Sequence, residues 1–590
     1  MESRRPLDSA CRSRGECELK GLRRCSIVIL FLCGLPTVLG QAASSHPPSI
    51  LQLKQLADAQ QWNDLAHLLQ AVTPRSAEMD FYYGEALAQL GRFAEAQNAF
   101  ETGRRLAPTD PRFPVELAGI AFKQKDYPQA IRRLRQSLRL APGDTYANDF
   151  LGTAYFLEGN LEASLKYWNH AGKPQIKNVR EDPEPRISPA LLDRAFAFSP
   201  DATLTLPQFL NSEARIRALG VFPQYQFDLS ARSDGAFDVS FQNQERNGFG
   251  DSKLESLFLF FQGLPFQEVN PQFYNLHRQA INFNSMYRWD AQKRRVFARV
   301  SGPFEHSAGY RWNLTTDLRD ENWAIRNGFT GPAPVRASFN MRHEIAAFDL
   351  ASYGDRFAWT AGAELSHRNF RSVVPGTGSG TPSGTVLTPQ MLATGYELKQ
   401  QAQISSTVWR VPERRFTVST SAASDAARLW STPQESFEKL TGSILWHWFP
   451  QAKGDDYEAS QQLRAGYTLG QVPFDELFIL GLERDNDLPL RAHIGTRDGR
   501  KGSAPLGRDY LLENWELNKN LYGNGLLHLQ LGPFVDIGKI TDPGTSLGSH
   551  QWLFDIGAQA KLRVFGSGLV FSYGKDLRTG NNAFYLMLLQ

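Results

Sequence analysis

The sequence has very little cysteine and no long apolar run beyond its first 43 residues. All four cysteines of the 590-residue chain lie within residues 1–33. No disulfide framework and no thiolate site can therefore form in the rest of the chain. A helical membrane span needs about 20 predominantly apolar residues, and no later stretch reaches even about 18. The length and composition thus predict a multidomain chain without disulfides or helical spans after the first 43 residues.

The chemistry of common enzymes is also missing from the sequence. There is no His-Glu-x-x-His, no phosphate-binding Gly-Lys-Ser/Thr loop and no Gly-x-Ser-x-Gly. The 11 histidines are scattered without the spacing of metal ligands, and the formal net charge is only +3. We therefore expect no enzyme activity, cofactor or metal site, and neither a nucleotide nor a nucleic acid as partner.

The first 42 residues have the pattern of a secretory signal peptide. Arg23 and Arg24 precede an apolar run over residues 25–39, and small residues follow at Gly40 and Ala42. A basic flank, about 15 apolar residues and a small-residue cleavage site are typical of such peptides. The alternative is a retained anchor, for which the run is short. Export without a helical span predicts the periplasm, the outer membrane or the medium.

Residues 50–172 repeat with a period of 34 residues. Small, large and turn-forming residues recur at that spacing: Gly84, Ala118 and Gly152; Phe93, Tyr127 and Leu161; Phe100, Leu134 and Trp168; Pro74, Pro108 and Pro142. This is the tetratricopeptide pattern, in which each repeat forms two antiparallel helices. Its framework residues here are Gly84, Pro108, Tyr127, Pro142 and Gly152. Such arrays bind peptides or partner proteins in a groove, and a rigid spacer is the alternative.

Residues 173–189 contain four prolines with mixed charges and predict a linker. A small α+β module is expected over residues 190–247. It would start with a strand at 191–198, continue with a helix at 204–219 closed by Gly220, and end with a hairpin around Asp234 and Gly235.

Residues 248–590 lack helical periodicity and alternate apolar with polar side chains in short segments. Examples are residues 254–261, 279–287, 357–365, 402–408 and 554–562. Strands of an outer-membrane barrel alternate in this way, and about 340 residues give roughly 16 antiparallel strands. Tryptophans at strand ends, such as Trp409 and Trp448, suit a membrane interface. A soluble β protein could show the same alternation.

Two short motifs stand out in the last quarter of the chain. A long polar loop carries Arg491, Ala492 and His493, and a later strand reads Phe534-x-Asp536-x-Gly538. An acidic side chain on an inward strand position needs a cation where water is scarce, so Asp536 is the expected partner of Arg491.

These motifs resemble those of the superfamily of outer-membrane proteins with POTRA modules and a barrel. That superfamily contains BamA-type assembly factors, two-partner secretion transporters and bacterial surface antigens. The stretch from Leu219 to Phe222 resembles a POTRA module. The resemblance implies that the loop folds into the barrel and that Arg491 meets Asp536, with Phe534 and Gly538 in support. Ala492 replaces the usual glycine and His493 the usual aromatic residue.

The resemblance implies a protein of the bacterial outer membrane with a periplasmic N-terminal part. It would insert or translocate polypeptides, and its helical repeats and POTRA-like module would dock substrates or periplasmic proteins. A different reading is an exopolysaccharide export porin with a tetratricopeptide scaffold. A third is a surface antigen or a passive pore.

Overall fold

The computed structural model describes residues 48–590, apart from residues 251, 327–332, 375–386, 432–433, 452–455, 524–526, 543–546, 550, 565–566 and 590. The expected signal peptide, residues 1–42, lies outside the described residues. The chain divides into two compact units. The first contains residues up to Ala147 with Pro174–Val179 and Leu229–Val239, and the second contains the remainder. None of the described helices is both long and apolar enough to cross a membrane.

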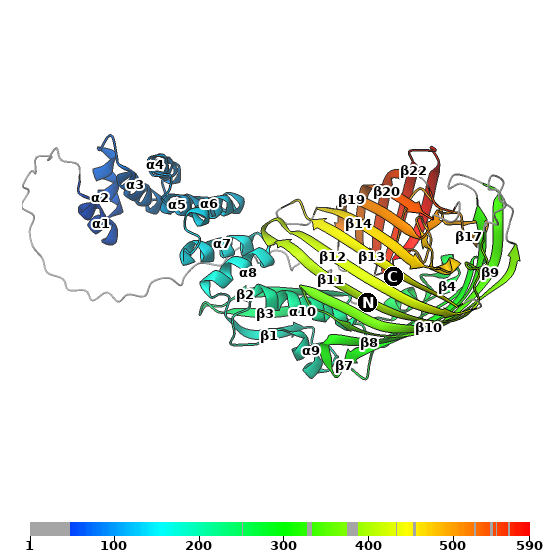
Figure 1. Ribbon diagram of the computed structural model, residues 1–590. Coiled ribbons are helices and arrows are strands. Elements are labelled where there is room, and N and C mark those ends of the chain that lie inside the picture. Colours follow the sequence, from blue (N-terminus) through cyan, green and yellow to red (C-terminus); the bar gives the residue numbers. More distant parts are fainter. Residues whose placement is uncertain are drawn as a thin grey trace, which may run out of the picture. The chain divides into compact units, whose positions relative to one another are not determined.

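Helices fill the region in which the sequence repeats (Figure 1). They are α1 (Ile50–Asp58), α2 (Trp62–Gln70), α3 (Ala77–Gln89), α4 (Phe93–Leu106), α5 (Arg112–Lys123), α6 (Tyr127–Leu140), α7 (Thr145–Leu157) and α8 (Leu161–Trp168), followed by the short η1 (Asn169–Ala171). Each 34-residue period from residue 77 onward thus contains two helices.

The repeated small residues are the points where paired helices approach each other. A Cβ atom on Gly84 of α3 would lie 2.6 Å from the ring of Phe100 on α4. A Cβ atom on Gly152 of α7 would overlap the ring of Trp168 on α8 in the same way. Only glycine fits beneath such a ring, which explains the alternation of small and large residues in the period.

The other framework residues lie at helix boundaries. Pro108 and Pro142 lie in the turns after α4 and α6, where the missing N–H and fixed φ of proline end a helix. Tyr127 is the first residue of α6, and its ring lies 5.4 Å from that of Phe122.

A three-stranded sheet with two helices follows. Its elements are β1 (Ile176–Asp182), α9 (Pro189–Ala195), α10 (Leu206–Leu219), β2 (Gln224–Ala231) and β3 (Phe237–Gln244), and the strand order is β1-β3-β2. Thr205 and Gln208 form a capping box at the start of α10. Gly220, with φ +66°, ends the helix in the left-handed conformation that glycine adopts without strain.

Two expectations for this module are wrong. The predicted strand at residues 191–198 is mostly helix α9, which begins with Pro189 at a position where a helix tolerates proline. The predicted linker, residues 173–189, contains β1. β1 is an edge strand with a single buried residue, Ile176, so its many charges resemble those of a linker.

Most of the remaining strands form a closed barrel in which the long neighbouring strands are antiparallel. Its strands are β4 (Glu268–Val269), β5 (Gln272–Leu276), β6 (Ile281–Trp289), β7 (Lys293–Phe304), β8 (Ser307–Arg326), β9 (Val335–Ser352), β10 (Phe357–Val374), β11 (Gly395–Val411), β12 (Phe416–Trp430), β13 (Glu435–Trp448), β14 (Tyr457–Gly470), β19 (Asp509–Gly523), β20 (Leu527–Thr541), β21 (Leu553–Val564), β22 (Ser567–Asp576) and β23 (Asn582–Leu589).

The number of strand positions is close to the 16 expected. β4 and β5 pair with successive parts of β6 and occupy one position together. With β6 to β14 and β19 to β23, the described residues fill fifteen positions. The predicted strand at 254–261 is wrong, because Lys253–Phe261 forms helix α11. Its start is capped by Ser252, whose hydroxyl accepts from the Glu255 N–H, a local signal that the apolar run conceals.

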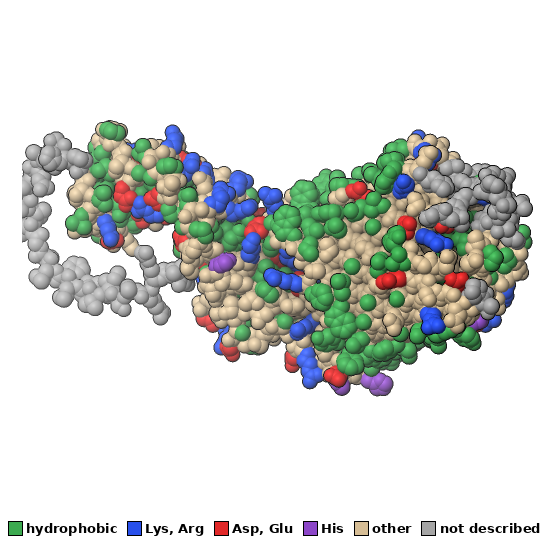
Figure 2. All heavy atoms as spheres, in the orientation of Figure 1, with side chains coloured by type: hydrophobic (Ala, Val, Ile, Leu, Met, Phe, Trp, Pro, Cys, Tyr) green, Lys and Arg blue, Asp and Glu red, His purple; other side chains and the backbone are tan. Residues whose placement is uncertain are grey.

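Exposed and buried residues alternate along the barrel strands. In contrast to a soluble protein, many of the exposed side chains are apolar and many of the buried ones are charged. On β21 the exposed residues Phe554 and Ile556 alternate with Leu553 and Asp555, which are buried. Aspartates are buried where hydrophobic residues are expected, and hydrophobic side chains gather over the outer face of the barrel (Figure 2). Trp409 and Trp448 are among the exposed aromatic residues. An apolar exterior around a polar interior is the pattern of a membrane barrel.

Candidate functional site: a loop held inside the barrel

The segment between β14 and β19, residues 471–508, folds against the inward face of the barrel strands; we call it the inner loop. It contains η4 (Phe474–Glu476) and the short strands β15 (Phe478–Ile479), β16 (Thr496–Arg497), β17 (Arg500–Lys501) and β18 (Leu506–Gly507). The side-chain amide of Asn486 donates to the carbonyls of Ile479, Gly481 and Leu488 at 2.8–3.2 Å. The loop therefore has a defined local structure before its contacts with the barrel are considered.

Arg491 of the inner loop lies directly against Asp536 of β20. Its backbone N–H and its Nε each donate to Asp536 Oδ2 at 2.9 Å, and its NH2 donates to Oδ1 at 2.6 Å. Its NH1 donates to Glu516 and Gln559. Arg491 is 5% exposed and Asp536 is fully buried. A buried charge is tolerated only when its hydrogen-bonding groups are paired, as they are here. The Arg491–Asp536 pair therefore attaches the inner loop firmly to β20.

The strand motif around Asp536 has a geometric explanation. The guanidinium carbon of Arg491 lies 3.8 Å from the centre of the Phe534 ring, a cation–π contact. A Cβ atom on Gly538 would lie 3.1 Å from Leu490 and 3.2 Å from Leu480. Phe534 thus packs its ring against the Arg491 guanidinium, and Asp536 binds that guanidinium. Gly538 leaves room for Leu490, the residue before Arg491.

Ala492 and His493 attach the loop to the next strand. The Ala492 N–H donates to Asp555 Oδ2 on β21 at 2.6 Å, and His493 Nδ1 lies 3.0 Å from the same oxygen. The backbone at Arg491 and Ala492 also passes so close to Gly574 of β22 that any side chain there would overlap it. The structure therefore brings Arg491, Ala492 and His493 together with Phe534, Asp536 and Gly538.

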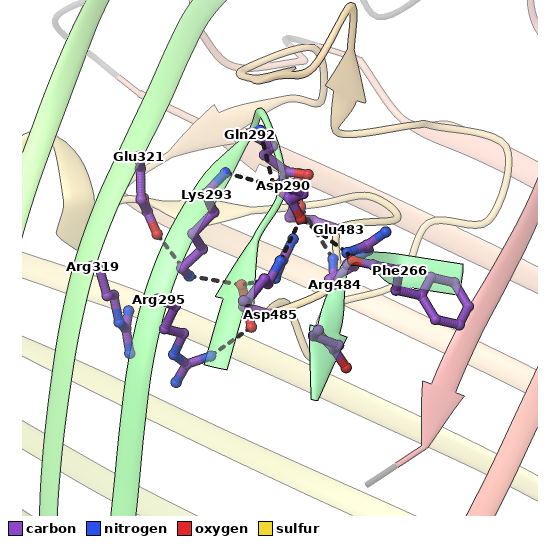
Figure 3. A network of polar contacts seen from close by, with 12 residues as sticks. Phe266, Asp290, Gln292, Lys293, Arg295, Arg319, Glu321, Glu483, Arg484 and Asp485 are labelled. Atoms are coloured by element: carbon purple, nitrogen blue, oxygen red, sulfur yellow. Dashed lines mark hydrogen bonds and ion pairs between the residues drawn. The ribbon is translucent and has the colours of Figure 1, made fainter. Parts of the chain in front are cut away.

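A second attachment lies on strands β6 to β8, where Asp485 meets three cations (Figure 3). Asp485 Oδ2 pairs with Lys293 Nζ at 2.7 Å and with Arg288 NH1 at 3.2 Å. Its Oδ1 pairs with Arg295 NH1 at 2.7 Å. Lys293 pairs in turn with Glu321 at 2.7 Å.

The residues on either side of Asp485 strengthen this attachment. Glu483 accepts from Gln292 and, at 2.6 Å, from the Thr496 hydroxyl. Arg484 donates to Asp290 at 2.9 Å and to the Phe266 carbonyl at 2.7 Å. In the sequence, Glu483, Asp485 and Asp487 form an acidic cluster without an evident partner, and the simplest interpretation is that they are solvated loop charges. That interpretation is wrong for Glu483 and Asp485, which are covered by strand residues of opposite charge or matching polarity.

A third attachment joins η4 to strands β10, β11 and β13. Glu476 pairs with Lys399 at 2.6 Å and with Lys439 at 3.1 Å. Asp475 lies 3.3 Å from Arg368, which also pairs with Glu397 at 2.7 Å. The inner loop is thus held by ionic contacts on three separate parts of the barrel wall.

An apolar cluster beside η4 covers part of the inner loop. Phe474 lies edge-on to the rings of Trp323 on β8 and Phe339 on β9, with centroids 5.0 and 4.9 Å apart. Further residues of β8, β9 and the inner loop, together with residues of β12, β13 and two other connections, complete the cluster: Ile325, Ala337, Met341, Leu387, Met391, Ala427, Phe437, Val472, Leu477, Leu506 and Leu547. Hydrophobic packing therefore supplements the ionic attachments.

Sequence reasoning missed the partners in the second and third attachments. Their common feature is charge at every second residue of a strand, as in Lys293 and Arg295, or Asp317, Arg319 and Glu321. Side chains two apart on a strand share one face. Charged residues at every second position, with apolar residues between them, indicate a strand with one face toward a polar barrel interior. This pattern could have identified the charged strand residues of the second and third attachments.

Comparison with known proteins gives distant similarities. No protein-family model and no curated protein matches the chain. Among solved structures, it is similar to BamA from Haemophilus ducreyi lacking POTRA domains 1–3, with 12% identity, a TM-score of 0.38, and coverage of 71% of this chain and 85% of that one. It is similar to CdiB from Escherichia coli with 12% identity, a TM-score of 0.45, and coverage of 70% and 76%. MamA is similar over 21% of this chain and 73% of its own, with 21% identity and a TM-score of 0.20.

Proposed function

We propose that this chain is an outer-membrane barrel protein that inserts or translocates polypeptides. The observation that carries the proposal is a folded loop fixed by charge pairs to three parts of the inner wall of a barrel with an apolar exterior. Such a loop occupies part of the barrel interior, and a transporter needs an element that closes the interior at rest and can be displaced. The ionic attachments suit that task, because water entering the barrel weakens them.

The closing seam of the barrel supports a polypeptide as the substrate. β23 closes on β4, a strand of two residues, whereas β8 and β9 pair in register from Tyr310 to Arg326. Few backbone hydrogen bonds hold such a seam. An incoming extended polypeptide can pair its own backbone with a strand edge exposed there, as in β-strand addition. Unpaired backbone groups in lipid cost several kcal/mol each, so pairing at the seam would be strongly favoured.

The N-terminal parts would supply docking surfaces in the periplasm. We assign the helices of residues 50–172 to a tetratricopeptide array, on the basis of the 34-residue period and the packing of Gly84 and Gly152. We assign the sheet and two helices that follow to a POTRA-like module. Both would bind polypeptide substrates or periplasmic partner proteins before these reach the barrel.

The pair of Arg491 and Asp536 attaches the inner loop to β20, and we call it the Arg491 pin. Its role can be tested by substitution. Arg491→Ala leaves the fully buried Asp536 without its cation, and such a loss costs about 3–5 kcal/mol. We expect the loop to detach, so that limited proteolysis cuts within residues 471–508 and transport falls while the barrel still assembles. Asp536→Ala should have the same effect. Arg491→Lys should give a partial loss, because lysine lacks the planar fork that binds both carboxylate oxygens.

Arg500→Ala is the matched control. Arg500 is an exposed arginine of the same loop, so the variant removes equal charge without touching the pin. The pin is refuted if Arg491→Ala and Asp536→Ala transport as well as the parent and keep the loop protected. The substrate class needs a separate measurement, which is photocrosslinking from Met587 of β23. Captured polypeptides support the proposal, and captured glycan would favour the polysaccharide export porin instead.

A further inference from the structure

Three aspartates form a continuous row on the inner wall of the barrel. Asp536 of β20 is the register partner of Asp555 on β21, and Asp555 is the register partner of Asp576 on β22. All three are at most 1% exposed. Like charges directly opposite each other on neighbouring strands are destabilising. A row of three buried carboxylates therefore requires several compensating positive charges.

The protein supplies those charges unevenly along the row. Arg491 binds Asp536. Asp555 and Asp576, in contrast, share the imidazole of His493, which is the only basic side chain paired with either of them within the described residues. Asp576 otherwise accepts from the Arg578 N–H and the Thr579 hydroxyl in the turn that follows β22. Two carboxylates facing one imidazole leave an excess of negative charge in a buried place.

The hydrogen bond of His493 determines which of its nitrogens is free. With Nδ1 donating to Asp555 Oδ2 at 3.0 Å, the lone pair of the neutral ring lies on Nε2. Nε2 makes no hydrogen bond within the described residues, and neither does Asp555 Oδ1. His493 is 1% exposed, so bulk water does not satisfy Nε2 either. A buried nitrogen lone pair and a buried carboxylate oxygen are thus left without donors.

The spacing of these groups suits one bound metal ion. His493 Nε2 lies 3.9 Å from Asp576 Oδ2, which is too long for a hydrogen bond. Two ligands of a tetrahedral ion at about 2.0–2.1 Å from the metal are separated by about 3.4 Å, so a small side-chain rotation brings both onto it. Asp555 belongs to the same cluster, in which the possible ligand atoms lie within 4.8 Å of one another, but it is held by Nδ1 on the other side of the ring and therefore orients the imidazole.

We propose that His493 Nε2 and Asp576 bind one divalent transition-metal cation, with zinc as the best fit, while Asp555 accepts from His493 Nδ1 and orients the ring. An imidazole nitrogen beside a carboxylate, with a second carboxylate accepting from the other ring nitrogen, suits zinc, whereas magnesium and calcium prefer sites made only of oxygen ligands. A charge of +2 balances the two aspartates that Arg491 does not reach. Because His493 belongs to the inner loop and the aspartates belong to β21 and β22, the ion ties the loop to the wall next to Arg491.

The test uses the full chain in lipid nanodiscs, first stripped of metal with EDTA. Zinc is titrated against a chelator of known affinity, and bound zinc per chain is measured by elemental analysis. We expect one tightly bound zinc per chain, and no comparable binding of magnesium or calcium. Asp576→Asn and His493→Ala should each weaken zinc binding by at least about tenfold. Zinc should also slow hydrogen exchange at residues 490–496 in the parent chain and not in the variants.

His343→Ala is the matched control. His343 is also a buried histidine beside an aspartate, with Nδ1 3.4 Å from Asp475, but no group of three possible ligands among the described residues includes it. This variant should bind zinc like the parent. If His493→Ala fails to fold, the comparison of zinc with EDTA in the parent chain still decides the matter. No zinc bound by the parent, equal binding by Asp576→Asn, or loop protection that follows pH without responding to zinc would each overturn the proposal. Failure here leaves the proposed transport function standing, because the Arg491 pin is tested without metal.

Discussion

The helical region buries mainly apolar side chains, whereas the barrel buries many charged side chains beside its apolar clusters. Between α3 and α5 the interior consists of residues such as Leu87, Phe100 and Phe113. The barrel interior holds Asp536, Arg368 and Lys293, all at most 1% exposed, while leucine and isoleucine cover its outside. The hydrophobic effect places apolar surface away from water in both regions. The proposed membrane location accounts for the difference, because the apolar medium would then be the core in one region and the lipid in the other.

The two interiors also differ in how they depend on individual residues. A hydrophobic core loses stability with the volume removed, because the cavity left behind is only partly filled. A polar interior loses stability when one member of a pair is removed, because the other charge stays buried. The following predictions are ordered from the largest expected effect to the smallest.

Phe100→Ala should destabilise the helical region alone. Phe100 is fully buried and covers Gly84, so its loss should cost about 3–5 kcal/mol. Hydrogen exchange should speed up for the amides of α3 to α6, while the heat-resistant mobility of the folded barrel on gels stays unchanged. Leu106→Ala, at an exposed position, is the control. Equal exchange in both variants would mean that the region is not organised around this packing.

Ile404→Arg should destabilise the barrel only where lipid surrounds it. Ile404 is exposed on β11, and an arginine near the middle of the bilayer costs about 2–4 kcal/mol. Urea unfolding in lipid vesicles measures the effect. Gln403→Arg, one residue away and on the inner face, should change stability by much less. If both variants behave alike, the outer face of the barrel does not contact lipid.

Phe534→Leu should loosen the inner loop without changing any charge. It removes the ring under Arg491 and leaves the Asp536 pairing intact, at a cost of about 0.5–2 kcal/mol. Protease cutting within residues 471–508 should become measurably faster, though slower than in Arg491→Ala. A rate as high as that of Arg491→Ala would show that the ring, and not the carboxylate, holds the arginine.

Glu116→Gln should stabilise the helical region at high pH. Burial, together with the nearby Glu85 carboxylate, raises the pKa of Glu116 to about 7. The folded state therefore holds a proton that the unfolded state releases, and the parent loses stability as the pH rises from about 4.5 to 7. The glutamine variant should be more stable than the parent by about 1 kcal/mol at pH 8, with no gain at pH 5. Hydrogen exchange of α5 at both pH values checks this, and a gain at pH 5 would contradict it.

Local sequence patterns were sufficient to predict those helices and strands whose own periodicity determines their conformation. The period of 34 residues predicted paired helices, and alternating polarity predicted most barrel strands. They failed for 191–198 and 254–261, where short apolar runs form helices α9 and α11. A run of about eight apolar residues suits a helix as well as a strand, and the deciding signals were Pro189 and the Ser252 cap.

The sequence by itself determined the two kinds of interior and the two motifs that meet at Arg491 and Asp536, because periodicity and local residue type encode them. Only the tertiary structure decided that Asp485 is buried against Lys293 and Arg295, and that Asp536, Asp555 and Asp576 lie in one row beside His493. These residues are far apart in the chain. Their meeting depends on strand register and on the path of the inner loop, which arise only when the whole barrel closes.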